Sequence, residues 1–343
     1  MKQYILATVL STLSSIQCAE QPNRSPREWM AQEYAQTNTF QAERFLHWIK
    51  EHNIPVKDQN IISIGCGTGE IEAALANRAR SVHGIDASKN MITYAQAHHN
   101  ATPNLSFRPN LSFQHCFAED FKTQQLHDLA FSSCCFHWIE DKPKALQAIC
   151  KSLVPAGLFF ANIETTTNSE PFGITVFEEM KRDVPIIGSI LTMLPNPTGS
   201  TLPTEQELQN MLDKAGFRVL MKKIEPYNCT MTSEEWRNHQ LPLLLSTPGA
   251  QMLINYTSDN WFAKTMSEQT FWWITMSEKE KTQHNAPFFP ECQNEFVQKI
   301  RKNNFCRYLF NNFLNRCLNK MQNNGNGTYT WRYETTLIFA QKK

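Results

Sequence analysis

The chain has 343 residues, which is enough for one large α/β domain with insertions or for a domain with a smaller cap. Hydrophobic residues make up 41% of the chain and aromatic residues 11%, so a substantial core can form and global disorder is excluded. The formal net charge is +1, and this balance gives no clear nucleic-acid signal and favours a small-molecule or protein partner over DNA.

Ten cysteines are scattered along the chain, and no C-x-x-C motif occurs. Cys134 and Cys135 are adjacent, which is not the spacing of a zinc site or a redox dithiol. A disulfide framework is also unexpected, because such frameworks are typical of small secreted domains. The sequence therefore predicts reduced, mostly buried cysteines and no metal site.

The N-terminal segment, residues 1–24, has the features of a signal-like leader or of an extension of the domain. Lys2 precedes an apolar run, Tyr4–Ile16, that is typical of a signal peptide and too short to span a bilayer comfortably. Gln17 stands where cleavage after Ala19 needs a small residue. Export through residues 1–19 and a helix lying on the domain both remain open.

The next part of the chain alternates between helical and strand patterns. A polar linker, residues 20–27, precedes a helix whose apolar face comprises residues 42, 45, 46 and 49 and which ends at Asn53–Pro55. Such alternation predicts a parallel sheet with right-handed crossovers. The expected strands are 61–64, 82–85, 111–115, 129–132 and 158–163, and the helices between them run through 71–75, 91–98 and 146–153.

The C-terminal half is less regular. Residues 165–203 hold no clear pattern, whereas Thr204 and Glu207 form a capping box for a helix that ends at Gly216. A turn signal at 154–157 precedes the fifth strand, and two more strands are expected at 217–222 and 333–341. Helical stretches are expected around 293–319, followed by a turn at 323–327.

The motif that carries chemistry is Ile61–Gly69 (IISIGCGTG), which follows a strand and opens a helix. Glycines in such a loop allow a sharp turn and bring a ligand onto the main chain. The spacing is GxGxG, and Glu70 stands where a dinucleotide fingerprint has its third glycine. A carboxylate there repels a pyrophosphate, so the loop suits a ligand with a positive or zwitterionic end, such as S-adenosylmethionine.

Asp86 ends the second strand, and a carboxylate there can accept hydrogen bonds from both ribose hydroxyls. The alternative is a helix N-cap before Ala87. Because sites for NAD share the acidic residue, Asp86 alone does not identify the ligand.

Five motifs in order resemble a class I S-adenosylmethionine-dependent methyltransferase. Gly65–Gly69 resembles its first motif, Gly84–Ser88 its second, Phe117–Asp120 its adenine-contacting stretch, Asp128–Trp138 its fourth strand, and Leu153–Gly157 the turn before its fifth strand. The resemblance covers about residues 28–164, 202–226 and 333–343.

The resemblance implies an α/β, Rossmann-like, mostly parallel seven-stranded sheet, with helices on both faces and a helical cap inserted before the last strand. The implied domains are a cofactor-binding core at 25–226, a cap or acceptor region at 227–332, and a final core strand at 333–343. Phe117 stands where the family often has an acidic residue, which shifts the adenine contact to Ala118 or Glu119. The implied cofactor residues are Gly65, Cys66, Gly67, Gly69, Asp86, Ala87, Ala118, Glu119 and Ser133.

A narrower resemblance is to small-carboxylate O-methyltransferases, which act on malonyl-carrier protein, trans-aconitate or juvenile hormone acid. His137 and Trp138 are similar to that group's strand-4 end, which implies a catalytic, acceptor-facing role; packing at the sheet edge is the alternative. Trp29, Tyr34 and Gln41 resemble its N-terminal helices, which close over the cofactor.

Other acceptor classes lack their motifs. The stretch Ser132–Phe136 contains neither the (D/N)PP(Y/F) signature of base N-methylation nor a Pro-Cys nucleophile, and nothing nearby marks Cys134 as reactive. A carboxylate is already ionised at neutral pH and needs no general base, so it fits this sequence. An aromatic cluster could line the acceptor pocket or form the core of a cap: Trp261, Phe262, Phe271, Trp272 and Trp273.

The sequence thus predicts an S-adenosylmethionine-dependent methyltransferase for a small-molecule or carrier-bound acceptor. The alternatives are a non-catalytic S-adenosylmethionine-binding protein and a methyltransferase that acts on a protein partner. Because the cofactor is made in the cytosol, a cytoplasmic site of action is favoured over export.

Overall fold

The computed structural model describes residues 28–37, 39–99, 110–166, 172–183, 201–237 and 304–343. In these ranges no helix has the length and apolar character needed to cross a bilayer. The signal-like leader, the aromatic cluster at 261–273 and the start of the helical stretch at 293 lie outside them.

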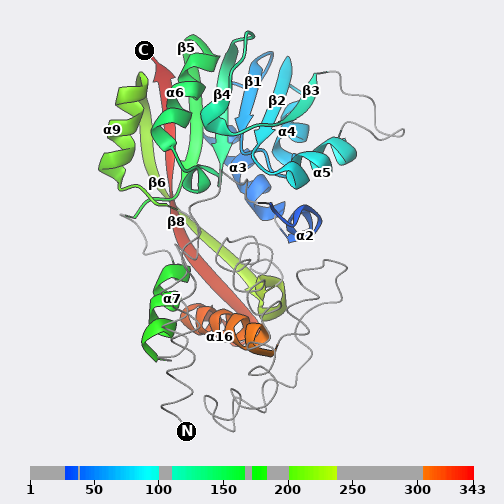
Figure 1. Ribbon diagram of the computed structural model, residues 1–343, viewed down its shortest axis with the longest axis vertical. Helices are drawn as coiled ribbons and strands as arrows, with labels where there is room; N and C mark the ends of the chain where they lie inside the picture. The colour runs from blue at the N-terminus through cyan, green and yellow to red at the C-terminus, as the bar shows by residue number, and fades with distance from the viewer. Residues whose placement is uncertain (1–27, 38, 100–109, 167–171, 184–200, 238–303) are drawn as a thin grey trace, which may run out of the picture.

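A twisted sheet forms the upper part of the molecule (Figure 1). Its strand order is β3-β2-β1-β4-β5-β8-β6, with the first five strands parallel and β8 antiparallel to both of its neighbours. The predicted α/β class with seven, mostly parallel strands is confirmed, and a two-residue strand, β7, pairs with β8 beside this path. The bounds are β1 Asn60–Ile64, β2 Ser81–Asp86, β3 Leu111–His115, β4 His127–Ser133, β5 Leu153–Ile163, β6 Phe217–Thr232, β7 Gln322–Asn323 and β8 Thr328–Lys342.

Helices cover both faces of this sheet, because the apolar side chains of its buried strands point to alternate sides. Ile62 and Ile64 belong to the core under α6 and α9, whereas Ile61 belongs to the core under α3, α4 and α5. Ser63 follows the same alternation and points toward the second of these faces. The helices are α2 Ala31–Thr37, α3 Thr39–Glu51, α4 Glu70–Leu75, α5 Lys89–His99, α6 Lys142–Ser152 and α9 Glu205–Ala215.

Two local features differ from the sequence-based expectations. The turn expected at 154–157 lies inside β5 as an irregularity: the register steps from His127↔Leu153 to Leu129↔Leu158, and Ala156 has φ 60°. The segment 165–203, for which no pattern was found, contains α7 (Phe172–Asp183). Its buried Val176 and Met180 are only four residues apart, which is too short a stripe to distinguish a helix in the sequence.

The last two long strands extend well beyond the strands expected at 217–222 and 333–341. They pair from Phe217↔Lys342 to Thr232↔Thr328 and run down to the lower part of the molecule, beside α7 and α16 (Asn304–Lys320) (Figure 1). There Arg316 pairs with Asp183 at 2.5 Å. The proposed domain boundaries at 226/227 and 332/333 fall within these continuous strands, and the domain division stays a prediction.

Packing of α9 onto the sheet gives a direct test of the core. Leu212 is fully buried in the cluster that includes Phe159 and Phe217. We expect Leu212→Ala to lower the free energy of unfolding by about 2–5 kcal/mol, measured by urea denaturation. The exposed Gln206→Ala on the same helix is the control and is expected to change it by less than about 0.5 kcal/mol. Equal effects of the two substitutions would contradict this packing.

Candidate functional site

The glycine loop is attached to the neighbouring strand by its own backbone. The N–H groups of Gly65 and Cys66 both donate to the carbonyl oxygen of Ile85, at 2.8 and 3.0 Å. Gly65 has φ 72°, and a Cβ built there would lie 2.0 Å from the Sγ of Cys135. A glycine is therefore required at this position, both for the left-handed backbone and for the approach of the loop that follows β4.

Gly67 and Gly69 serve different purposes in the same loop. Gly67 has φ 54°, and a Cβ there would meet nothing closer than the Cε1 of Tyr34 at 4.0 Å, so its face is open. A Cβ at Gly69 would lie 2.8 Å from the ring of Phe113. Gly69 thus allows close packing against β3, and it does not line the cavity described next.

A cavity lies between this loop, the two N-terminal helices and the end of β4. It brings together six of the predicted cofactor residues, and the hydroxyl of Tyr34 donates to the Oε1 of Gln41 at 3.2 Å across one wall. The lining residues are Tyr34, Gln41, Ala42, Ser63, Gly65, Cys66, Gly67, Thr68, Glu70, Ile71, Glu72, Phe131 and Ser133.

Asp86 connects the end of β2 to the glycine loop. Its Oδ2 accepts from the N–H of Gly67 at 3.0 Å, and its Oδ1 accepts from the N–H of Ser88 at 2.8 Å. Burial raises the pKa of this carboxyl, while the two backbone hydrogen bonds act in the opposite direction. Next to it, the carbonyl oxygen of Ala87 accepts from the Nε2 of His115 at 2.9 Å.

The segment that carries Tyr34 is held at the beginning of α5. The Oε2 of Glu28 accepts from the hydroxyl of Ser88 at 2.9 Å and from the N–H of Asn90 at 3.1 Å. The ring of Trp29 packs edge-on against Tyr34, with centroids 5.8 Å apart, and against Trp138, with centroids 5.5 Å apart. An aromatic row therefore joins the cavity wall to the loop after β4.

His137 and Trp138 lie in that loop, in the short helix η2 (Phe136–Trp138). Their ring centroids are 4.8 Å apart, and the carbonyl oxygen of His137 accepts from the N–H of Thr201 at 3.0 Å. His137 is buried, and neither residue lines the cavity. Cys134, which precedes η2, has φ 49°, and burial raises the pKa of its thiol to about 11, so the thiol is neutral at physiological pH.

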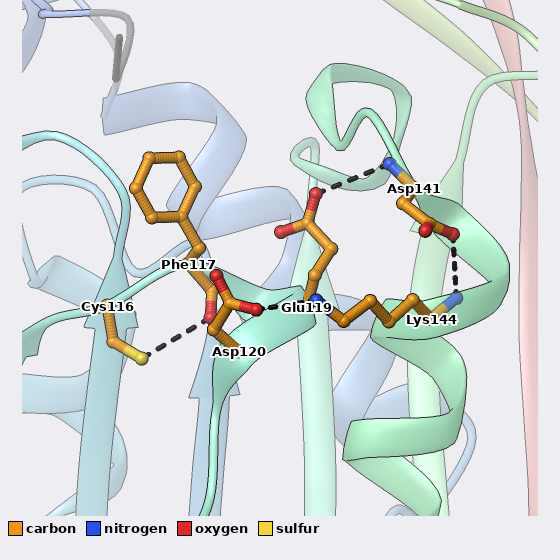
Figure 2. Close-up of polar contacts among 6 residues, drawn as sticks. All are labelled: Cys116, Phe117, Glu119, Asp120, Asp141 and Lys144. Atoms are coloured by element: carbon orange, nitrogen blue, oxygen red, sulfur yellow. Dashed lines mark hydrogen bonds and ion pairs between the residues drawn. The ribbon is translucent and has the colours of Figure 1, made fainter. Parts of the chain in front are cut away.

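The stretch expected to contact adenine turns its acidic side chains toward α6. In η1 (Ala118–Asp120), the Oε1 of Glu119 accepts from the N–H of Asp141 at 3.3 Å, while Asp120 pairs with Lys144 at 2.6 Å (Figure 2). Phe117 points away from Glu119 in the same view. Ala118 is buried in the core. The structure does not bring Asp86, Ala87, Ala118 or Glu119 into the lining of the cavity.

Sequence reasoning missed a buried polar pair that does line the cavity. The hydroxyl of Ser63 donates to the Oε1 of Glu72 at 2.5 Å, and Glu72 is 1% exposed. Its Oε2 has no hydrogen-bond partner among the described residues. Burial raises the pKa of this carboxyl to about 8. The available signal was that Glu72 lies three residues before the buried Leu75, hence on the inward face of α4.

The charge of the cavity is one-sided. Its described lining contains the carboxyl groups of Glu70 and Glu72 and no Lys, Arg or His. Asp86 adds a third carboxyl directly behind Gly67. The lining therefore opposes a phosphate and is compatible with a cationic or zwitterionic ligand.

The family model and the relatives that match this chain are all methyltransferases. Residues 55–216 match a family described as a methyltransferase domain. An uncharacterised methyltransferase of Schizosaccharomyces pombe is 24% identical over 195 residues, which cover 56% of this chain and 71% of that protein. The human mitochondrial ubiquinone biosynthesis O-methyltransferase is 31% identical over 134 residues, covering 38% and 36% of the two chains.

A third relative is a malonyl-[acyl-carrier protein] O-methyltransferase of Ilyobacter polytropus, 25% identical over 178 residues, which cover 50% of this chain and 61% of that protein. The aligned segments thus span between 36% and 71% of the relatives' own lengths. Residues 55–216 are therefore a class I S-adenosylmethionine-dependent methyltransferase domain, with S-adenosylmethionine as its cofactor.

Proposed function

We propose that the cavity beside the glycine loop binds S-adenosylmethionine and that the protein transfers the methyl group to a small-molecule or carrier-bound carboxylate. The observation that carries the proposal is the open backbone of Gly67 in a cavity lined by carboxyl groups. An open glycine lets a ligand lie directly on the main chain, and acidic walls complement a ligand with a sulfonium and an ammonium group.

The cofactor contacts follow from the free hydrogen-bonding capacity of the site. Each oxygen of Asp86 accepts one backbone hydrogen bond and has a second lone pair, which leaves both able to accept from a ribose hydroxyl. Gly65, Cys66 and Gly67 would supply the main-chain surface. We assign the adenine contact to the main chain near Ala87 and Ala118, because the Glu119 side chain turns toward Asp141 at the start of α6.

Tyr34, Gln41 and Ser133 would close the same site and exclude water from it. S-adenosylmethionine, when bound, supplies an electrophilic methyl group on a positively charged sulfur. What the chain contributes is orientation and close approach of the acceptor, and we assign this acceptor side to His137 and Trp138.

A carboxylate acceptor suits the protonation state of the nearby groups. Burial raises the pKa of Tyr34 well above its usual range and that of Cys134 to about 11, so neither group accepts a proton at neutral pH. A carboxylate needs no such base because its pKa of about 4 leaves it ionised. The similarity to a malonyl-[acyl-carrier protein] O-methyltransferase supports the same choice.

A phenolic hydroxyl is the second candidate acceptor, favoured by the 31% identity to a ubiquinone biosynthesis O-methyltransferase. A phenol has a pKa of about 10 and must lose its proton during transfer, for which His137 would be the available base. The two candidates therefore differ in pH dependence and in the stability of the product.

The acceptor prediction is tested by mass-spectrometric detection of S-adenosylhomocysteine with malonyl-carrier protein, free di- and tricarboxylates, and catechols. At saturating S-adenosylmethionine, we expect turnover with an acid, a rate that is flat between about pH 6 and pH 8, and a methyl ester that mild alkali hydrolyses. A product stable to alkali and a rate that rises with pH would transfer the assignment to a phenol. Cofactor binding without turnover on any acceptor, protein substrates included, would contradict catalysis.

The role of Asp86 is tested by substitution. We expect Asp86→Ala to weaken S-adenosylmethionine binding at least tenfold, because a hydrogen bond to a charged group is worth about 1.5–3 kcal/mol. Asp128→Ala is the matched control: the Oδ2 of Asp128 also accepts a backbone bond, from the N–H of Asn60 at 2.8 Å, but at the opposite end of the strands. Calorimetry showing equal losses for the two variants would remove Asp86 from the site.

Two glycines of the loop, Gly67 with its open face and Gly65 against Cys135, give a paired prediction. Gly67→Ala should cost about 1–2 kcal/mol of folding stability for its left-handed backbone and should also strongly weaken cofactor binding, since its Cβ enters the cavity. Gly65→Ala should destabilise the fold more, because its Cβ would overlap the Sγ of Cys135. Thermal unfolding and calorimetry separate the effects. A Gly67→Ala protein with wild-type affinity would show that the ligand does not approach this face.

A further inference from the structure

The pair formed by Ser63 and Glu72 is not explained by packing alone. Glu72 is 1% exposed, and its only described side-chain hydrogen bond is the one that Ser63 donates to Oε1. A neutral carboxyl with this arrangement carries its proton on Oε2, the atom that finds no acceptor in the described part of the chain. Leaving a buried polar group without a partner is costly, which suggests that the partner belongs to the ligand.

The position of the pair supports this interpretation. Both residues line the cavity together with the glycine loop, Ser63 from the buried strand β1 and Glu72 from α4. Strand β1 lies in the sheet, and α4 is one of the helices that cover it. Glu72 thus lines the same cavity as the open face of Gly67.

We infer that the Ser63–Glu72 pair is a cation-binding part of the cofactor site, in which Glu72 gives up its proton to solvent when a positively charged group of the ligand enters beside it. The inference rests on the proposed binding of S-adenosylmethionine in this cavity. That ligand offers two cationic groups, the sulfonium and the α-ammonium, and the chemistry required of either is the same.

The groups that face Glu72 keep its carboxyl protonated as long as no cation is bound. Burial raises its pKa most, and Glu70 on its own helix and Asp86 from β2 raise it further, whereas hydrogen bonds from Ser63 and from the backbone of Glu72 lower it. Cys66 of the loop and Tyr34 of α2 are neutral, because burial raises the pKa of each. The nearest guanidinium on α3, that of Arg44, lies over the rings of Trp48 and Tyr227.

Cofactor affinity is expected to depend on pH through Glu72. With a pKa of about 8, the carboxyl is protonated in the free protein at neutral pH, and a cation beside it favours the ionised form. Binding therefore releases a proton, and the affinity rises with pH, by up to about tenfold per pH unit, until it levels off near that pKa.

The experiment is calorimetry at about pH 7 in buffers of different ionisation enthalpy, with S-adenosylmethionine and S-adenosylhomocysteine as the two ligands. The wild type is compared with Glu72→Gln, which keeps the shape and the acceptor for Ser63 but cannot ionise. Because the ligand's α-amino group also titrates at about 7.7–8.0, the quantity read is the difference between the two proteins. Asp128→Asn, which removes a carboxyl group at the opposite end of the strands, is the matched control.

We expect the wild type and Asp128→Asn to release nearly one proton more than Glu72→Gln. Release with both ligands identifies the ammonium as the cation, and release with S-adenosylmethionine alone identifies the sulfonium, since S-adenosylhomocysteine lacks that charge. Ser63→Ala removes a bond that lowers the pKa of Glu72 and should move the pH at which affinity levels off upward.

Binding without any proton release that depends on Glu72 overturns this inference and leaves the proposed function intact. Absence of binding to the folded wild type, checked by thermal unfolding, overturns both. A Glu72→Gln protein that fails to fold leaves the comparison of the wild type with Ser63→Ala as the deciding measurement, and an unchanged pH dependence there contradicts the inference.

Discussion

The contact between Gly65 and Cys135 is the constraint on which the site depends. The sulfur of Cys135 occupies the space that any side chain at position 65 would need, which lets the loop after β4 reach the loop after β1. The N–H groups of Gly65 and Cys66 bind the glycine loop to the carbonyl oxygen of Ile85, and the N–H of Gly67 binds it to the carboxyl of Asp86. With three strand ends joined in this way, the open face of Gly67 is turned toward the cavity instead of into the core.

The same arrangement concentrates carboxyl groups, and this has a cost in stability. Glu72 has a pKa of about 8 in the folded chain against an ordinary 4.5, so the folded state binds its proton more tightly than the unfolded state does. Stability therefore falls as pH rises through that window, because ionisation of the buried carboxyl is penalised only in the folded protein. A bound cation would remove this loss of folding stability. Such a loss is common where a functional site places ionisable groups in a core.

Sequence could predict the parts of the site that depend on neighbours along the chain. The glycine spacing, Glu70 and the acid at the end of β2 are read from local order, and Tyr34 and Gln41 were reached through a family resemblance. Partners distant in sequence were not predictable. Gly69 packs on Phe113, Glu119 faces Asp141, and Ser63 finds Glu72 only because strand alternation and helix periodicity turn both inward. The extension of β6 was missed although its outer half alternates: Tyr227 and Met231 are buried, whereas Asn228 and Thr230 are exposed.

The acidic cavity and a carboxylate acceptor together determine the order in which cofactor and acceptor bind. An anion approaching Glu70 and Asp86 is repelled as long as no cation lies between them, since low-dielectric walls screen charges poorly. The proposals for the cofactor and for Glu72 both place a positive charge there. Together they imply that the acceptor enters after the cofactor, from the side where Trp29 and Trp138 form the aromatic row. The acid lining would then select the cofactor, and the charge that the cofactor brings would select the acceptor.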